Sequence, residues 1–64
     1  MDDQQVMDFL KTFGKVPANR LTTELIIAGM GECFNYANNP KAVIADIARD
    51  RYLELSKELL ARIA

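Results

Sequence analysis

The sequence contains no histidine, no tryptophan and only one cysteine, Cys33, and these absences narrow the chemistry open to the chain. One cysteine cannot form a disulfide within the chain. Without histidine or a second cysteine there is no zinc-ligand set, so we expect no structural metal. A free thiol is typical of reducing compartments, which favours a cytoplasmic protein.

Charge of one sign and long apolar runs are also lacking. Eight basic and nine acidic residues give a formal net charge of −1, whereas nucleic-acid and anionic-membrane surfaces usually begin from a basic excess. Residues 1–5 are acidic and polar, where a secretory signal is basic and then apolar, and no apolar run approaches membrane-spanning length. We therefore expect no membrane partner.

What the sequence does contain is a high share of apolar residues in a short chain. Half of the 64 residues are hydrophobic, which is enough for a packed core. A domain of this size buries only about 60% of its unfolded surface, so its own core provides a thin margin of stability. With disulfides and metals excluded, self-association remains as the source of further stability, and we expect a homodimer.

Three helices are predicted, and the first spans about residues 3–13. Asp2 and Asp3 can cap it, and Gly14 is its expected end. Pro17 disfavours helix in the segment that follows, and Asn19 is the expected cap of the second helix. The stripe that identifies the first helix repeats at three- and four-residue spacing: Val6, Phe9, Leu10 and Phe13.

The second helix is predicted over about residues 20–38. Its apolar arc is expected to face a core, and Leu21, Leu25 and Tyr36 lie on a flank beside it. The β-branched pairs in this stretch favour a strand as the competing interpretation, but no second strand-like run is present to pair with it. The residues of the arc are Ile26, Ile27, Met30, Cys33, Phe34 and Ala37.

The segment Asn38-Asn39-Pro40 ends this helix and predicts a third, over about residues 40–62, with Asn39 as its cap and Pro40 at its first position. Leu53 and Leu60 lie one heptad apart, away from the main apolar stripe, and predict a second contact surface. The main stripe comprises Ile44, Ala48, Tyr52, Leu55, Leu59 and Ile63.

The predicted fold is therefore all-α and a single domain over residues 1–64. A short N-terminal helix precedes a long antiparallel helical hairpin, and two hairpins are expected to pair as a dimeric helical bundle.

No residue pattern predicts catalysis or a cofactor. Cys33 lies on an apolar arc without a histidine or a nearby base to activate it, so a buried structural thiol is the better interpretation. Gly29-Met30-Gly31 lies inside a helical pattern and lacks the further glycine and lysine of a phosphate-binding loop. We expect a protein that is not an enzyme and binds no cofactor or metal.

The leading hypothesis is a noncatalytic protein-interaction module, namely a small regulator, inhibitor or assembly adaptor that acts as a homo-oligomer. Leu25, Gly29 and Tyr36 are the predicted self-association residues, because a glycine on an apolar flank permits close helix approach. Leu53 and Leu60 are the predicted contacts with a larger protein partner.

Two alternatives remain open from the sequence. Arg20, Arg49 and Arg51 from two chains would form a basic patch for nucleic acid, although the near-neutral charge does not favour this function. A small ligand would instead bind at the dimer seam, where Gly29 and Gly31 leave room and Tyr36 or an arginine orients it.

Overall fold

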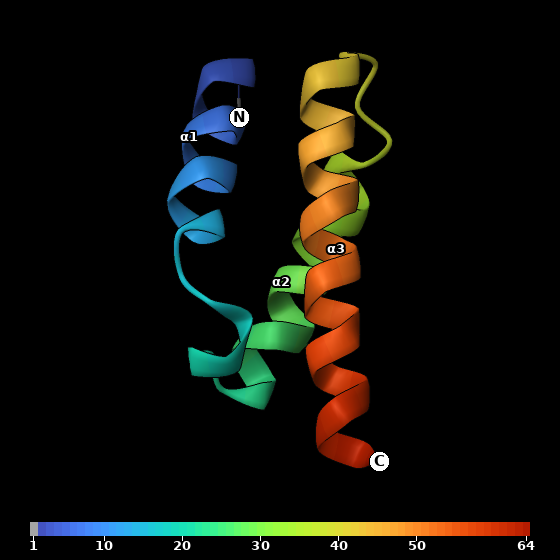
Figure 1. Cartoon of the computed structure of the whole chain (residues 1–64). Helices are drawn as coiled ribbons and strands as arrows, with labels where there is room; N and C mark the ends of the chain where they lie inside the picture. Colours follow the sequence, from blue (N-terminus) through green and yellow to red (C-terminus); the bar gives the residue numbers. More distant parts are fainter. Residues whose placement is uncertain (1) are drawn as a thin grey trace.

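A computed structural model describes residues 2–64 and shows three α-helices and one short 3-10 turn, with no strand in this range (Figure 1). The helices are α1 (Asp3–Gly14), α2 (Thr23–Tyr36) and α3 (Ala42–Ile63), and the 3-10 turn η1 (Ala18–Arg20) lies between α1 and α2. The described chain measures 35 × 18 × 14 Å along its principal axes. The all-α prediction is confirmed.

Helix α1 begins where the acidic start of the sequence predicts. The Asp2 carboxylate accepts a hydrogen bond from the Gln5 amide at 2.8 Å, and the Gln5 side chain in turn accepts one from the Asp2 amide at 3.0 Å. This reciprocal pair is a capping box, which satisfies two amides that have no partner within the helix. The helix ends at Gly14 without a left-handed residue.

The predicted start of the second helix is wrong. Asn19 is not its cap, because Asn19 and Arg20 belong to η1. Helix α2 starts at Thr23, and Thr22 is its cap, with a hydroxyl that accepts a hydrogen bond from the Leu25 amide at 3.2 Å. A threonine side chain can therefore fix the helix start three residues later than the apolar period alone suggests.

The start of the third helix also differs from the prediction. Helix α3 begins at Ala42 with Lys41 as its cap residue, so Pro40 lies in the preceding turn rather than at the first helical position. Asn39 stabilises that turn instead, since its side-chain oxygen accepts a hydrogen bond from the Lys41 amide at 2.9 Å. An Asx-type turn of this kind competes with helix capping at asparagine.

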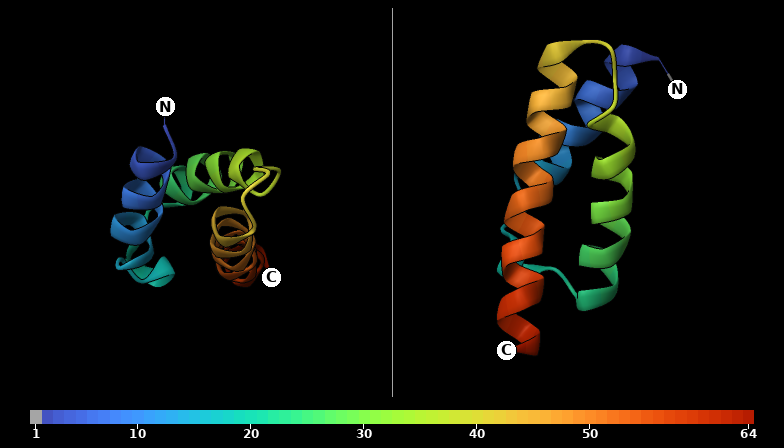
Figure 2. Two further views of the ribbon diagram at one scale, coloured as in Figure 1. Left: turned by 90° about the horizontal axis from the view of Figure 1, so that it is seen from above. Right: turned by 90° about the vertical axis from the view of Figure 1, so that its right-hand side faces the viewer.

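Helices α2 and α3 lie side by side, and α1 packs against one side of the layer that they form (Figure 2). In the right-hand view of Figure 2, α1 lies behind this layer. The core draws on all three helices and on η1, and its fully buried side chains include Leu10, Ile26, Cys33, Ile44 and Leu55. We call the side of the α2–α3 layer that is turned away from α1 the open face.

The apolar stripes predicted from the sequence are only partly buried. On α2, Ile26 and Cys33 are buried, but Ile27 and Phe34 of the same arc are 56% and 60% exposed. On α3, Ile63 is 73% exposed, because it lies in the last turn, beyond the start of α2. One chain covers only one side of the α2–α3 layer, so the rest of each stripe faces solvent.

Candidate functional site

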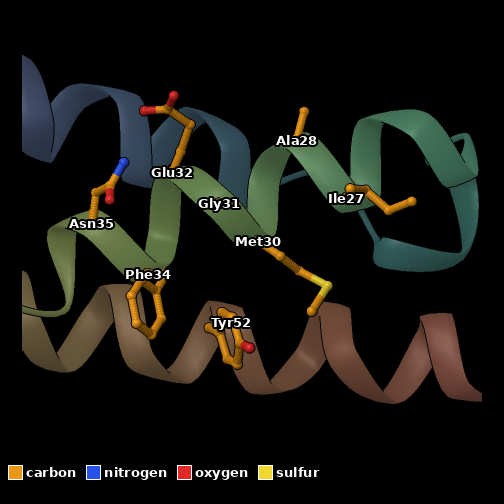
Figure 3. Close-up of a pocket in the computed structure, with 8 residues that line it drawn as sticks. All are labelled: Ile27, Ala28, Met30, Gly31, Glu32, Phe34, Asn35 and Tyr52. Carbon is orange, nitrogen blue, oxygen red and sulfur yellow. The ribbon is translucent and has the colours of Figure 1, made fainter.

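The open face carries a shallow groove of about 500 Å3 between α2 and α3. Phe34 and Met30 point from α2 toward α3 in Figure 3, where the Tyr52 ring lies beside Phe34. The Phe34 and Tyr52 ring centroids are 6.2 Å apart at an interplanar angle of 50°. Glu32 and Ala28 point away from α3, so the charged Glu32 side chain lies at the edge of the groove that is farther from α3. The groove floor is therefore apolar and aromatic.

Leu53 and Leu60 are two further exposed apolar residues, which lie on α3 outside the groove. They are 55% and 62% exposed, which matches a surface separate from the core. At roughly 100° per residue they lie about 200° and 180° around the helix from Arg51, whose guanidinium contacts α1. Both leucines therefore project from the side of α3 that is turned away from α1. This is the same side of the α2–α3 layer on which the groove lies.

The predicted self-association residues Leu25, Gly29 and Tyr36 lie on the opposite flank of α2, beside α1. A Cβ built on Gly29 would overlap the end of the Phe13 ring, and would lie 3.3 Å from the Leu55 Cδ1 atom. The Tyr36 ring meets Phe9 edge-on, with centroids 5.8 Å apart. The close approach that was predicted from a second chain at Gly29 is therefore made by α1 of the same chain. Of the three residues, Leu25 is the most exposed, at 53%.

The Tyr36 phenol is also tied to its own helix. Burial raises the pKa of Tyr36, and a hydrogen bond with Glu32 raises it further. A small groove of about 270 Å3 remains between α1 and α2, lined by Phe9, Phe13, Leu25, Ala28, Gly29 and Glu32. Gly29 borders this groove, whereas Gly31 borders the open-face groove, so the two glycines do not meet at one ligand site.

Arg20, Arg49 and Arg51 do not form one surface patch. Arg20 and Arg49 are exposed, and Arg49 pairs with Asp46 at 3.3 Å. The structure corrects the placement of Arg51, whose side chain is only 4% exposed. Its Nη2 donates to the Phe13 and Val16 carbonyl oxygens at 2.9 and 2.6 Å, and its guanidinium lies 4.6 Å from the Phe13 ring centroid. Arg51 therefore holds α1 to α3 instead of facing an external phosphate.

A second arginine of α3 has a similar role nearer the C-terminal end. Arg62 Nη2 donates to the Leu21 carbonyl oxygen at 2.6 Å, and Nη1 donates to the Thr23 hydroxyl at 3.0 Å. Glu58 lies one turn earlier and pairs with Arg62 Nε at 3.3 Å. Neither the Arg51 nor the Arg62 contacts could be predicted from the sequence, because no local pattern distinguishes an arginine that bonds to backbone carbonyls from a surface arginine.

Cys33 is the cysteine that the sequence singles out, and its thiol is not accessible. Cys33 is fully buried, and this burial raises the pKa of its thiol, while the Arg51 charge opposes the rise. A protonated, inaccessible thiol is a poor nucleophile. Within residues 2–64, no group of three or more histidine, cysteine, aspartate or glutamate side chains is placed to hold a metal ion.

Over the same range, none of the helices combines the length and the apolar composition that crossing a membrane requires. Comparison with known proteins adds no further assignment, since no protein-family model, curated protein or solved structure matches the chain. The candidate functional site is therefore defined by its own geometry: the open face, with the groove on α2 and the two leucines on α3.

Proposed function

We propose that the protein is a noncatalytic helical protein-interaction module that acts as a homo-oligomer. In this role α2 and α3 form an antiparallel hairpin, which pairs with the hairpin of a second copy in a helical bundle. The paired module serves as a regulator, inhibitor or assembly adaptor and presents its remaining helical surface to a larger protein.

The open face is the observation that carries this proposal. Ile27, Phe34, Leu53 and Leu60 are each more than half exposed. Ile27 and Phe34 border the groove on the open face, and Leu53 and Leu60 lie on the opposite side of α3 from Arg51, which contacts α1. Isolated exposed apolar side chains are ordinary on protein surfaces, but several large ones on the same face of a helix pair favour an interaction site. Catalysis gains no comparable support, since Cys33 is buried and the described aspartate and glutamate residues are exposed or half-buried.

Sedimentation velocity over a concentration series tests the proposal directly. We expect a mass that rises from one to two chains as concentration increases, with unchanged helicity by circular dichroism. A folded monomer at every concentration would contradict the homo-oligomer, and would leave the open face for an unlike protein.

A further inference from the structure

The two glycines of α2 differ in what they meet within the chain. Gly29 has close neighbours in its own chain, because a Cβ there would overlap the tip of the Phe13 ring and force the ring to shift. A Cβ on Gly31 would have nothing within 4 Å. Glycine weakens the interior of a helix relative to alanine, so a glycine is expected where a close neighbour requires it. No described contact of this chain requires Gly31.

Gly31 also lies at the centre of an apolar strip. Ile27 is four residues before it and Phe34 three residues after it, and all three border the groove on the open face. The two large side chains are seven residues apart, as are Leu53 and Leu60 on α3. Seven residues span about 10.5 Å of helix, so both strips place two large side chains at one spacing. Two ridges with equal spacing can interleave as knobs and holes.

The level of the two strips is fixed by the contact of Phe34 with Tyr52, whose ring centroids are 6.2 Å apart. If the two-fold axis is parallel to α2 and α3, each residue of the second copy has the same position along the axis as that residue has in the first copy; we call this position its level. Such an axis would place Leu53 of the second copy between the levels of Gly31 and Phe34, where α2 has no side chain at Gly31. The missing side chain then leaves room for the leucine.

The exposed apolar area is close to what a stable dimer needs. A standard interface buries about 800 Å2 per partner, which is roughly a fifth of the 4411 Å2 surface of this chain. About 57% of such an interface is apolar, or about 450 Å2. Ile27, Phe34, Leu53 and Leu60 are 55–62% exposed and supply roughly 100 Å2 each, so these four side chains nearly provide that area.

Charge favours contact of α2 with α3 over contact of α2 with another α2. The charged residues of α2 are both acidic, Glu24 and Glu32, so two α2 helices in contact would bring like charges together. On α3, Leu53 has Lys57 one turn after it and Arg49, which pairs with Asp46, one turn before it. Contact of the α2 strip with Leu53 and Leu60 therefore places the acidic helix α2 near Lys57 and not near a second pair of glutamates.

We propose that the open face is the self-association surface, in a two-fold dimer in which the Ile27–Gly31–Phe34 strip of each copy receives Leu53 and Leu60 of the other copy. This inference rests on the proposed function, because it specifies the homo-oligomer. It also moves the self-association surface from the Leu25, Gly29 and Tyr36 flank, which α1 covers in part, to the opposite side of α2.

Single substitutions test the surface, with sedimentation velocity and circular dichroism as the measurements. Leu53→Asp and Leu60→Asp should each weaken dimerisation at least a hundredfold while the chain stays helical. Val43→Asp is the matched control, since Val43 is 63% exposed, lies on the same helix and borders a groove with Gln4 and Met7 of α1, away from the open face. Gly31→Ala should weaken the dimer at least tenfold and yet raise the melting temperature of the dilute monomer, so its effect cannot arise from unfolding.

A complementary pair of variants tests which strips meet. Gly31→Lys and Leu53→Asp should each be monomeric alone, but a mixture of the two proteins should form a heterodimer. In that heterodimer one contact joins the lysine with the aspartate, and the symmetry-related contact keeps the natural Gly31 and Leu53. If α2 faced α2, mixing would restore nothing.

The outcomes separate this inference from the proposed function. A wild-type dimer that survives Leu53→Asp, Leu60→Asp and Gly31→Ala would overturn the open-face inference and leave the homo-oligomer standing. Monomeric single variants whose mixture stays monomeric would overturn the pairing of α2 with α3. A wild-type protein that is monomeric throughout would overturn both proposals.

Discussion

Replacement of Arg51 by methionine is expected to remove a large part of the stability of the fold. A chain of 64 residues has a free energy of unfolding of roughly 3–10 kcal/mol. Arg51 donates to the carbonyl oxygens of Phe13 and Val16, and hydrogen bonds from a charged group contribute about 1.5–3 kcal/mol each. The loss of both is about 3–6 kcal/mol.

Part of this loss is offset. Arg51 Nε is buried without an acceptor among the described residues, and removal of that unsatisfied group returns about 1–3 kcal/mol. The ion pair with Glu54, which is 53% exposed, adds at most about 1 kcal/mol to the arginine's contribution. We therefore expect Arg51→Met to lower the free energy of unfolding by about 2–4 kcal/mol. The free energy of unfolding of Arg51→Lys should lie between those of the wild-type protein and Arg51→Met. An ammonium keeps the charge but lacks the forked donors that reach both carbonyl oxygens.

Urea denaturation at one fixed protein concentration, followed by circular dichroism, measures these differences. Arg49→Met is the matched control, because Arg49 lies on the same helix with its side chain 59% exposed, and we expect a change within about 0.5 kcal/mol. Hydrogen exchange should also show faster exchange of the α1 amides in Arg51→Met. If Arg51→Met were as stable as Arg49→Met, the carbonyl contacts would not be what holds α1 in place.

Three further predictions concern the core. Gly29→Ala should destabilise the fold by about 0.5–2 kcal/mol in a thermal melt, because the overlap with Phe13 outweighs the better helix propensity of alanine; a more stable variant would show that α1 does not pack there. Leu55→Ala, at a fully buried position, should cost about 2–5 kcal/mol in urea, and a cost below about 1 kcal/mol would mean that the site is not packed as described. Burial raises the pKa of Cys33, so the folded chain holds this proton more tightly than the unfolded chain. The stability from this group is then present below the usual thiol pKa and is lost as pH rises through the raised pKa of the folded chain. Cys33→Ala should remove this part of the fall in urea midpoints between neutral and alkaline pH, whereas the part due to the raised pKa of Tyr36 should remain.

Helix type and order were predictable from the sequence because they depend on local patterns. The apolar period and the acidic start place α1 at Asp3–Gly14, and Asn39-Pro40 marks a break before α3. The starts of α2 and α3 were not predictable in the same way. Thr22 and Asn19 are both acceptable caps in sequence, and the choice between them depends on η1, whose Ala18 is buried against the core.

The candidate site was only half predictable for a related reason. Leu53 and Leu60 stand apart from the main stripe of α3, so the helical period alone identifies them as exposed. Ile27 and Phe34 share an arc with core residues, and only the position of α1 decides which edge of that arc stays open. Arg51 was misplaced because burial of a guanidinium depends on free carbonyls from residues 35 and 38 positions away in the chain.

Two arginines of α3 bond to backbone oxygens in the segment that runs from the last turn of α1 to the start of α2: Arg51 bonds to Phe13 and Val16, and Arg62 bonds to Leu21. Every amino acid supplies such an oxygen, so these contacts hold the path of the segment without holding its side chains. Changes of residue type at the exposed positions of this segment that preserve the backbone course should be tolerated, whereas the buried Ala18 should not accept a larger side chain. Insertion of one residue between Val16 and Leu21 should move the Leu21 oxygen relative to the Arg51 acceptors, so that the two guanidinium groups can no longer reach all of their oxygens. The exposed part of the segment is thus tolerant of substitution, and the whole segment is strict in length.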